Sequence, residues 1–205
     1  MISALFRLRQ ANLWGDYGSV LISGYASRDA ALGQLSLHRS GPFAPPIFFP
    51  WGSDCGPSVV VTQTFRQALE RADFGRLSFR PVSKKRIVEF HWHNWDRSAD
   101  EPAEHPNSGE PEDYIWDGQH SRRAASQMEE LWELIAPVVP CEIERQWSKT
   151  LGVPDTFHFR PAGKEYRGLF RNREEYFDLV VDSPTRQWFE KLVAEWVGFD
   201  DLIFV

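Results

Sequence analysis

The chain has 205 residues, of which 42% are hydrophobic and 25% charged, and its formal net charge is −6. This composition is typical of a soluble globular protein with its own core, and no apolar run approaches the roughly 18 residues of a membrane span. No patch of lysine and arginine stands out, so the composition excludes general nucleic-acid binding and membrane spanning.

Short strand-like runs open the chain. Glycine and aspartate separate them, and we predict strands over Ala4–Arg9, Ser19–Tyr25 and Gln34–His38. The N-terminus has no basic segment followed by an apolar one, so we expect no signal peptide and a cytoplasmic protein. Four prolines between Ser40 and Gly52 predict an ordered loop there.

A strand–helix–strand unit follows. Val59–Val61 predict a buried strand, the polar Thr-Gln-Thr segment that follows it predicts a helix cap, and apolar residues from Phe65 to Ala72 recur at helical spacing. Asp73-Phe74-Gly75 ends the helix, and Arg76–Val82 returns as a strand.

The C-terminus repeats this plan. Leu179–Val181 predict a strand, Ser183 is the expected N-cap with Pro184 at the first helical position, and Leu202–Phe204 predict a final strand. At an offset of 120 residues, positions 59–70 and 179–190 share five identities. We therefore predict two similar strand–helix–strand units.

Between the units we predict a strand over Lys85–Trp92, a helix over Ser121–Ile135, and strands at Cys141–Trp147 and Thr156–Pro161. The predicted fold class is α+β, with mostly antiparallel short strands and about three helices. We expect one domain over residues 1–205, with possible sub-units 1–92 and 118–205 joined by an acidic loop, residues 93–117.

Most of the negative charge lies in that loop. Eight acidic residues and one base, Arg97, lie between Asp96 and Asp117, so this stretch carries −7. Such carboxylates suit three roles: a solvated loop, an acidic protein-binding surface, or paired catalytic acids. Aromatic residues flank the acids, as they do at the energetic centres of interfaces, although they also suit pinning the loop to the core. The partner-binding set that we predict is Trp92, Trp95, Asp100, Glu101, Glu104, Glu110, Glu112, Asp113, Tyr114 and Trp116.

His91 and His93 are the weak candidates for metal ligands. On a strand, alternate residues face the same side, so both imidazoles would reach one ion. No residue at a diagnostic spacing supplies a third ligand, and we predict neither a metal nor a cofactor. The alternative function is a metal-dependent hydrolase that uses these two histidines.

Other catalytic patterns are missing from the sequence. It has no phosphate-binding glycine loop, nucleophile elbow or zinc-protease helix motif. The two cysteines, Cys55 and Cys141, form neither a disulfide framework nor a zinc ribbon. We therefore predict that the chain is not an enzyme. A scaffold module built from the two units is a further alternative.

Two parts of the sequence carry short motifs: Arg66, Leu69 and Phe79–Val82 in the first unit, and "GEPEDYIW" at Gly109–Trp116 in the acidic loop. These motifs resemble those of the immunity proteins of bacterial polymorphic toxin systems. The resemblance implies a small cytoplasmic protein that binds and neutralises one cognate toxin and has no catalytic residues. An acidic loop favours a toxin with a basic surface, because complementary charge speeds association. We expect no nucleic acid or membrane as partner, and the oligomeric state stays open.

Overall fold

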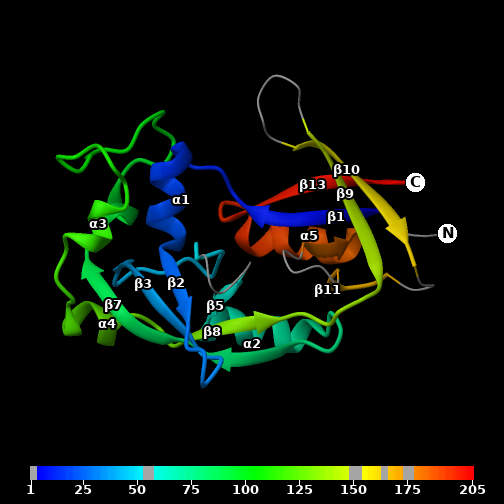
Figure 1. Ribbon diagram of the computed structural model, residues 1–205, viewed down its shortest axis with the longest axis horizontal. Helices are drawn as coiled ribbons and strands as arrows, with labels where there is room; N and C mark the ends of the chain where they lie inside the picture. Colours follow the sequence, from blue (N-terminus) through cyan, green and yellow to red (C-terminus); the bar gives the residue numbers. More distant parts are fainter. Residues whose placement is uncertain (1–3, 53–57, 148–153, 163–165, 173–177) are drawn as a thin grey trace.

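Three β-sheets and five α-helices make up the described part of this protein (Figure 1). The structure is a computed structural model that describes residues 4–52, 58–147, 154–162, 166–172 and 178–205. The fold is α+β with mostly antiparallel pairing, as the sequence predicts. None of the helices in these ranges is long and apolar enough to cross a membrane.

The largest sheet has six strands in the order β11-β12-β1-β13-β10-β9, and only the β10–β13 pair is parallel. Its strands are β1 (Leu5–Gln10), β9 (Cys141–Trp147), β10 (Pro154–Pro161), β11 (Leu169–Arg171), β12 (Leu179–Asp182) and β13 (Val197–Phe204). A four-stranded sheet has the order β4-β5-β8-β6. Its strands are β4 (Ile47–Phe48), β5 (Val60–Thr62), β6 (Ser78–Pro81) and β8 (Leu131–Ile135).

The third sheet has the order β2-β3-β7 and a parallel β3–β7 pair. Its strands are β2 (Tyr25–Arg28), β3 (Leu35–Gly41) and β7 (Ser83–Glu89). The helices are α1 (Gly15–Ser23), α2 (Gln63–Ala72), α3 (Asp113–Trp116), α4 (Arg122–Gln127) and α5 (Ser183–Val193), with a 3-10 helix over Trp92–Asn94. Helices α1 and α3 lie at one end of the molecule and strands β9 and β10 at the other (Figure 1).

Two similar strand–helix–strand units recur, as the sequence predicts. In the first unit β5 leads into α2 and β6, and in the second β12 leads into α5 and β13. The strand order β4-β5-β8-β6 has its counterpart in β11-β12-β1-β13. The cross-strand partners also correspond: Val61 pairs with Ile47 and Trp132 in the first unit, and Val181 with Leu169 and Phe6 in the second.

An arginine on each helix shows how closely the units match. The Nε of Arg66 binds the Glu70 carboxylate at 2.9 Å, and its guanidinium lies over the rings of Trp132 and Phe79. These contacts combine a pair one helical turn apart with a cation–π clamp. The second unit repeats them with the residues at the corresponding positions: Arg186, Glu190, Phe6 and Phe199.

The two units also contain one ion pair with the charges reversed. In the first, Arg80 on β6 binds Glu133 on β8 at 2.9 Å. In the second, Asp200 takes the place of Arg80 and Arg7 the place of Glu133, and they bind at 2.8 Å. The geometry of the pair is therefore kept, while the sign of each partner is exchanged.

The units share one core through their helices. The Phe65 ring on α2 lies 5.6 Å from Trp188 and 5.9 Å from Phe189, both on α5. The main cluster of buried apolar residues takes side chains from both units and from the three-stranded sheet. A second, smaller cluster under β9 and β10 contains Cys141, whereas Cys55 lies outside the described residues.

The predicted strand over Ser19–Tyr25 is wrong, because most of this segment is helix α1. The short apolar run in this segment fits a buried helix as well as a buried strand, so hydrophobicity alone does not distinguish the two structures. Two glycines have steric roles in this segment: Gly18 permits a close backbone contact, and Gly24 marks the end of the helix. A side chain at Gly18 would collide with the Leu13 carbonyl, and Gly24 ends the helix at a φ of 64° while donating to Val20.

The predicted helix over Ser121–Ile135 is also wrong in its second half. Helix α4 ends at Gln127, and Leu131–Ile135 forms β8 between β5 and β6. The apolar residues fit helical spacing, but strand pairing on both sides supplies the backbone hydrogen bonds, so tertiary context overrides the local pattern.

Smaller differences concern the ends of elements. The strand predicted over Lys85–Trp92 ends at Glu89, so His91 and His93 lie beyond it. The N-cap of α5 is Asp182 rather than Ser183, and it accepts from the Thr185 amide as Thr62 does from Phe65 in the first unit. The proline-rich segment after Ser40 contains the short strand β4.

Candidate functional site: an acidic loop and its pocket

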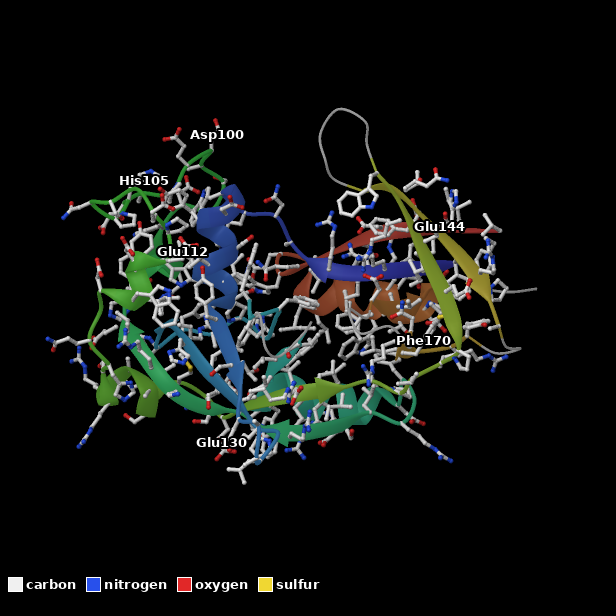
Figure 2. All side chains as sticks on the ribbon, viewed as in Figure 1. Asp100, His105, Glu112, Glu130, Glu144 and Phe170 are labelled. Carbon is white, nitrogen blue, oxygen red and sulfur yellow. The ribbon has the colours of Figure 1, made fainter. Side chains whose placement is uncertain are left out.

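The acidic loop, residues 93–117, runs across α1 at one end of the molecule, and Figure 2 labels Asp100, His105 and Glu112 along it. Side chains of α1 and its N-cap fasten the loop. The indole of Trp14 donates to the Ala99 carbonyl at 2.9 Å, and the Tyr17 hydroxyl donates to the Gly109 carbonyl. The loop is therefore held against a helix at two points.

Further contacts order the loop along its length. The Tyr17 ring packs edge-on against His105, and the Tyr114 hydroxyl donates to the Glu104 carbonyl. At the start of the loop, Arg97 binds Glu195 at 3.0 Å and lies over the Trp196 ring. These contacts fix the backbone and leave most of the carboxylates to solvent.

The predicted acidic residues divide by exposure. Asp100, Glu101, Glu104 and Glu110 are exposed, and none of them makes an ion pair within the described residues. Glu112 and Asp113, at the start of α3, are half-buried. Four of the six predicted carboxylates thus lie on the surface without an ion pair to any residue that the structure describes.

The predicted aromatic residues differ more widely. Trp92 is a core residue with 0% exposure, its indole donates to the Ser40 hydroxyl at 3.0 Å, and its ring packs on Phe43 and Trp196. It cannot contact a partner directly, which corrects its place in the predicted set. Trp92 begins the 3-10 helix that follows β7, and its side chain is part of the main buried cluster.

The other three aromatics lie at or near the surface. Trp95 and Tyr114 are half-buried and both pack on Phe90, at 5.4 Å and 4.6 Å. Trp116 is 43% exposed and packs on the rings of Tyr25 and His38. Trp95 and Tyr114 therefore pin the loop, while Trp116 has the greatest area available to another molecule.

The two histidines beyond β7 face different neighbours. His91 is exposed and its Nε2 lies 3.5 Å from the Glu89 carboxylate, whereas the His93 ring stacks on Phe43 at 4.9 Å. Their ring centroids are 5.8 Å apart. Among the residues that the structure describes, no group of three histidine, cysteine, aspartate or glutamate side chains is close enough to hold a metal ion.

A cavity of about 180 Å³ lies where the acidic loop meets α1. Its walls come from four separate parts of the chain: α1, the start of β2, the segment after β4, and the loop. Three carboxylates, two aromatic rings and two apolar side chains line it: Asp16, Glu110, Glu112, Tyr25, Trp51, Val20 and Pro111. We call this cavity the acidic–aromatic pocket.

The two aromatic walls are held by backbone hydrogen bonds. The Trp51 amide donates to the Gly24 carbonyl at 3.0 Å, and the Ala26 amide donates to the Trp51 carbonyl at 2.6 Å. These two hydrogen bonds make an isolated parallel β-bridge between Tyr25 and Trp51. Gly24 is required at this point, because a side chain there would meet Arg39. Trp116 packs against the Tyr25 ring at 5.5 Å.

All the charged residues that line the pocket are negative. None of the seven lining residues is basic, so the formal charge of the lining at neutral pH is −3. Burial, followed by the neighbouring Glu112 carboxylate, raises the pKa of the Tyr25 phenol, which therefore stays neutral. The Oε2 oxygen of Glu112 is buried and makes no hydrogen bond of normal geometry within the described part of the chain, and the Tyr25 phenol is a donor that lies beside this carboxylate.

The acidic residues on the loop side of this pocket are visible in the sequence, whereas the side formed by α1, the start of β2 and the segment after β4 is not. Asp16, Tyr25 and Trp51 lie 59 or more residues before Glu110 in the chain, and no local pattern joins them. Comparison of the chain with models of known protein families, with curated proteins and with solved structures finds no match in any of the three.

Proposed function

We propose that this chain is a non-catalytic immunity protein, which binds a toxin with a basic surface through the acidic loop and neutralises it by occlusion. The observation that carries the proposal is a set of exposed carboxylates that form no ion pair within the described residues, on a loop whose backbone is already fixed. A surface that is ordered before binding loses little conformational entropy in the complex.

The chemistry of the loop supports a basic partner. A carboxylate already paired with a lysine or arginine of its own chain would gain little from a partner's cation. Asp100, Glu101, Glu104 and Glu110 make no such pair with the residues that the structure describes, and their field extends into solvent. Complementary charge of this kind mainly raises the association rate and suppresses wrong partners.

The resemblance of the chain to immunity proteins implies that the partner is a toxin. We expect a large modular secreted protein encoded beside this chain, one domain of which is the toxin. Co-expression of that domain with the chain should restore bacterial growth. If the neighbouring genes encode no such protein, or if co-expression gives no protection, the immunity proposal fails.

The binding surface is tested with matched charge variants. The loop variant replaces Asp100 with Asn and Glu101 with Gln, and the control variant replaces Glu130 and Glu144 with Gln. All four side chains are exposed, and both variants remove two negative charges. The loop variant should associate with the toxin about tenfold more slowly, and the control should keep the wild-type rate. Equal rates for the two variants would contradict binding through this loop.

A further inference from the structure

The acidic–aromatic pocket has a lining that selects the charge of its occupant. Three carboxylates repel phosphates, carboxylates and other anions, and the lining residues offer no lysine or arginine to offset them. A cavity of about 180 Å³ is also small compared with sites for drug-sized ligands, which are about 300–1,000 Å³. The pocket therefore suits a small cationic group.

The aromatic walls distinguish an organic cation from a metal ion. Metal ions such as calcium and magnesium need several oxygen ligands around one point, and the described residues hold no such group. Tyr25 and Trp51 instead contribute aromatic rings to the lining, and the π faces of such rings attract guanidinium and alkylammonium groups. Apolar contacts from Val20 and Pro111 suit the hydrocarbon stem of such a group.

Glu112 supplies the observation that points most directly to a ligand. Its Oε2 oxygen is buried at the pocket and makes no hydrogen bond of normal geometry within the described residues, although the Tyr25 phenol beside the carboxylate is a donor whose pKa the carboxylate raises. A buried acceptor without a donor is costly, and a donor that enters the pocket relieves that cost. Because this oxygen atom is buried although Glu112 as a whole is half-buried, a charged donor would bind it more strongly than a carboxylate at an open surface.

Several contacts keep the pocket in shape without a ligand. Backbone hydrogen bonds hold Tyr25 beside Trp51, and Tyr17 fastens Gly109 one residue before Glu110. An entering side chain therefore needs to order little of the protein.

We propose that this pocket binds an arginine side chain presented by the basic partner. Arginine fits better than lysine, because its planar guanidinium stacks on aromatic rings, is weakly hydrated, and carries five donors for the carboxylates. The identity of the occupant rests on the proposed function, since it assigns that arginine to the protein that the acidic loop attracts.

The test uses the full chain and Nα-acetyl-arginine methylamide as the probe. Binding is followed by the indole N–H resonance of Trp51 in a two-dimensional NMR spectrum, assigned with Trp51→Phe. The expected result is a saturable shift that is at least about fivefold weaker with the Nα-acetyl-lysine probe and absent with the neutral citrulline probe.

A charge variant of the pocket complements the probes. Glu112→Gln should weaken the arginine probe about tenfold, while the exposed control Glu144→Gln should not change it. No saturable shift with wild-type protein, or equal shifts with arginine and citrulline, overturns the pocket assignment even if a variant does not fold. An equally strong lysine probe overturns the choice of arginine.

The outcomes separate this inference from the proposed function. If the loop variant at Asp100 and Glu101 slows toxin binding but the arginine probe does not bind, the proposed function stands and the pocket assignment fails. If the probe binds but the loop variant associates with the toxin at the wild-type rate, the selectivity of the pocket for arginine stands, whereas toxin binding through the acidic loop fails.

Discussion

Replacing Trp92 separates a structural role from an interface role for the aromatic residues around the acidic loop. Its side chain is fully buried, donates to Ser40 at 3.0 Å, and packs on the rings of Phe43 and Trp196. Trp92→Ala removes a large buried ring and leaves a cavity, which costs about 3–5 kcal/mol. The Ser40 hydroxyl also loses a donor, at about 1 kcal/mol.

The comparison residue is Trp116, which is 43% exposed and contacts Tyr25 and His38 at the surface. Trp116→Ala should cost no more than about 1 kcal/mol, since exposed substitutions seldom cost more. Urea unfolding followed by circular dichroism measures both variants. Trp92→Phe, which keeps an aromatic ring, should cost about 1–2 kcal/mol and provides a folded variant if Trp92→Ala unfolds.

Toxin binding by these variants completes the test. Folded Trp92→Phe should bind the toxin as the wild type does, because the indole is inaccessible. The reasoning is refuted if Trp92→Ala costs less than about 1 kcal/mol, or if Trp92→Phe keeps its stability but loses binding.

Three further predictions follow from individual contacts. Burial, and then the charges of Lys85 and Arg86, lower the pKa of His38 below its ordinary value near 6.5, so the folded protein favours the neutral ring. The contribution of His38 to the free energy of unfolding is therefore fully present above pH 6.5 and is lost as the pH falls below that value. The free energy of unfolding should consequently fall less between pH 7.5 and pH 5.5 in His38→Gln than in the wild type. Arg66→Lys and Arg186→Lys should each lower the free energy of unfolding in urea by about 1 kcal/mol, because lysine has no planar group to stack on the two rings. A large cost at only one of the two sites would contradict the equivalence of the units. Glu133→Gln leaves Arg28 and Arg80 without their shared carboxylate and should lower the free energy of unfolding by about 2–4 kcal/mol in the same assay. A cost below about 0.5 kcal/mol would mean that solvent screens the charges of Glu133 and the two arginines.

The two strand–helix–strand units were predictable because their signals are local. Thr62 caps α2 with its own side chain, and Pro184 lies in the first turn of α5. The shared Arg66 and Glu70 positions predicted a repeat that the registers and the two cation–π clamps bear out. Capping and spacing are read within one turn of helix, so neighbouring residues suffice.

The errors arise where distant residues decide the structure. Leu131–Ile135 has helical spacing, but β5 and β6 lie on either side of it and pair with it as a strand. Trp92 was placed among the partner-binding residues because its position beside the acids is visible in the sequence, whereas its packing on Phe43 and Trp196 is not. The pocket was missed for the same reason, since Asp16, Tyr25 and Trp51 approach Glu112 only in the folded chain.

The salt dependence of toxin association tests the central claim most directly. The association rate constant of the full chain with the toxin domain is measured by stopped flow between about 50 and 300 mM salt. If the acidic loop attracts a basic surface, the rate should fall at least about tenfold over this range, and the loop variant at Asp100 and Glu101 should fall less steeply. An association rate that does not change with salt, or the same slope for wild type and loop variant, would contradict the account.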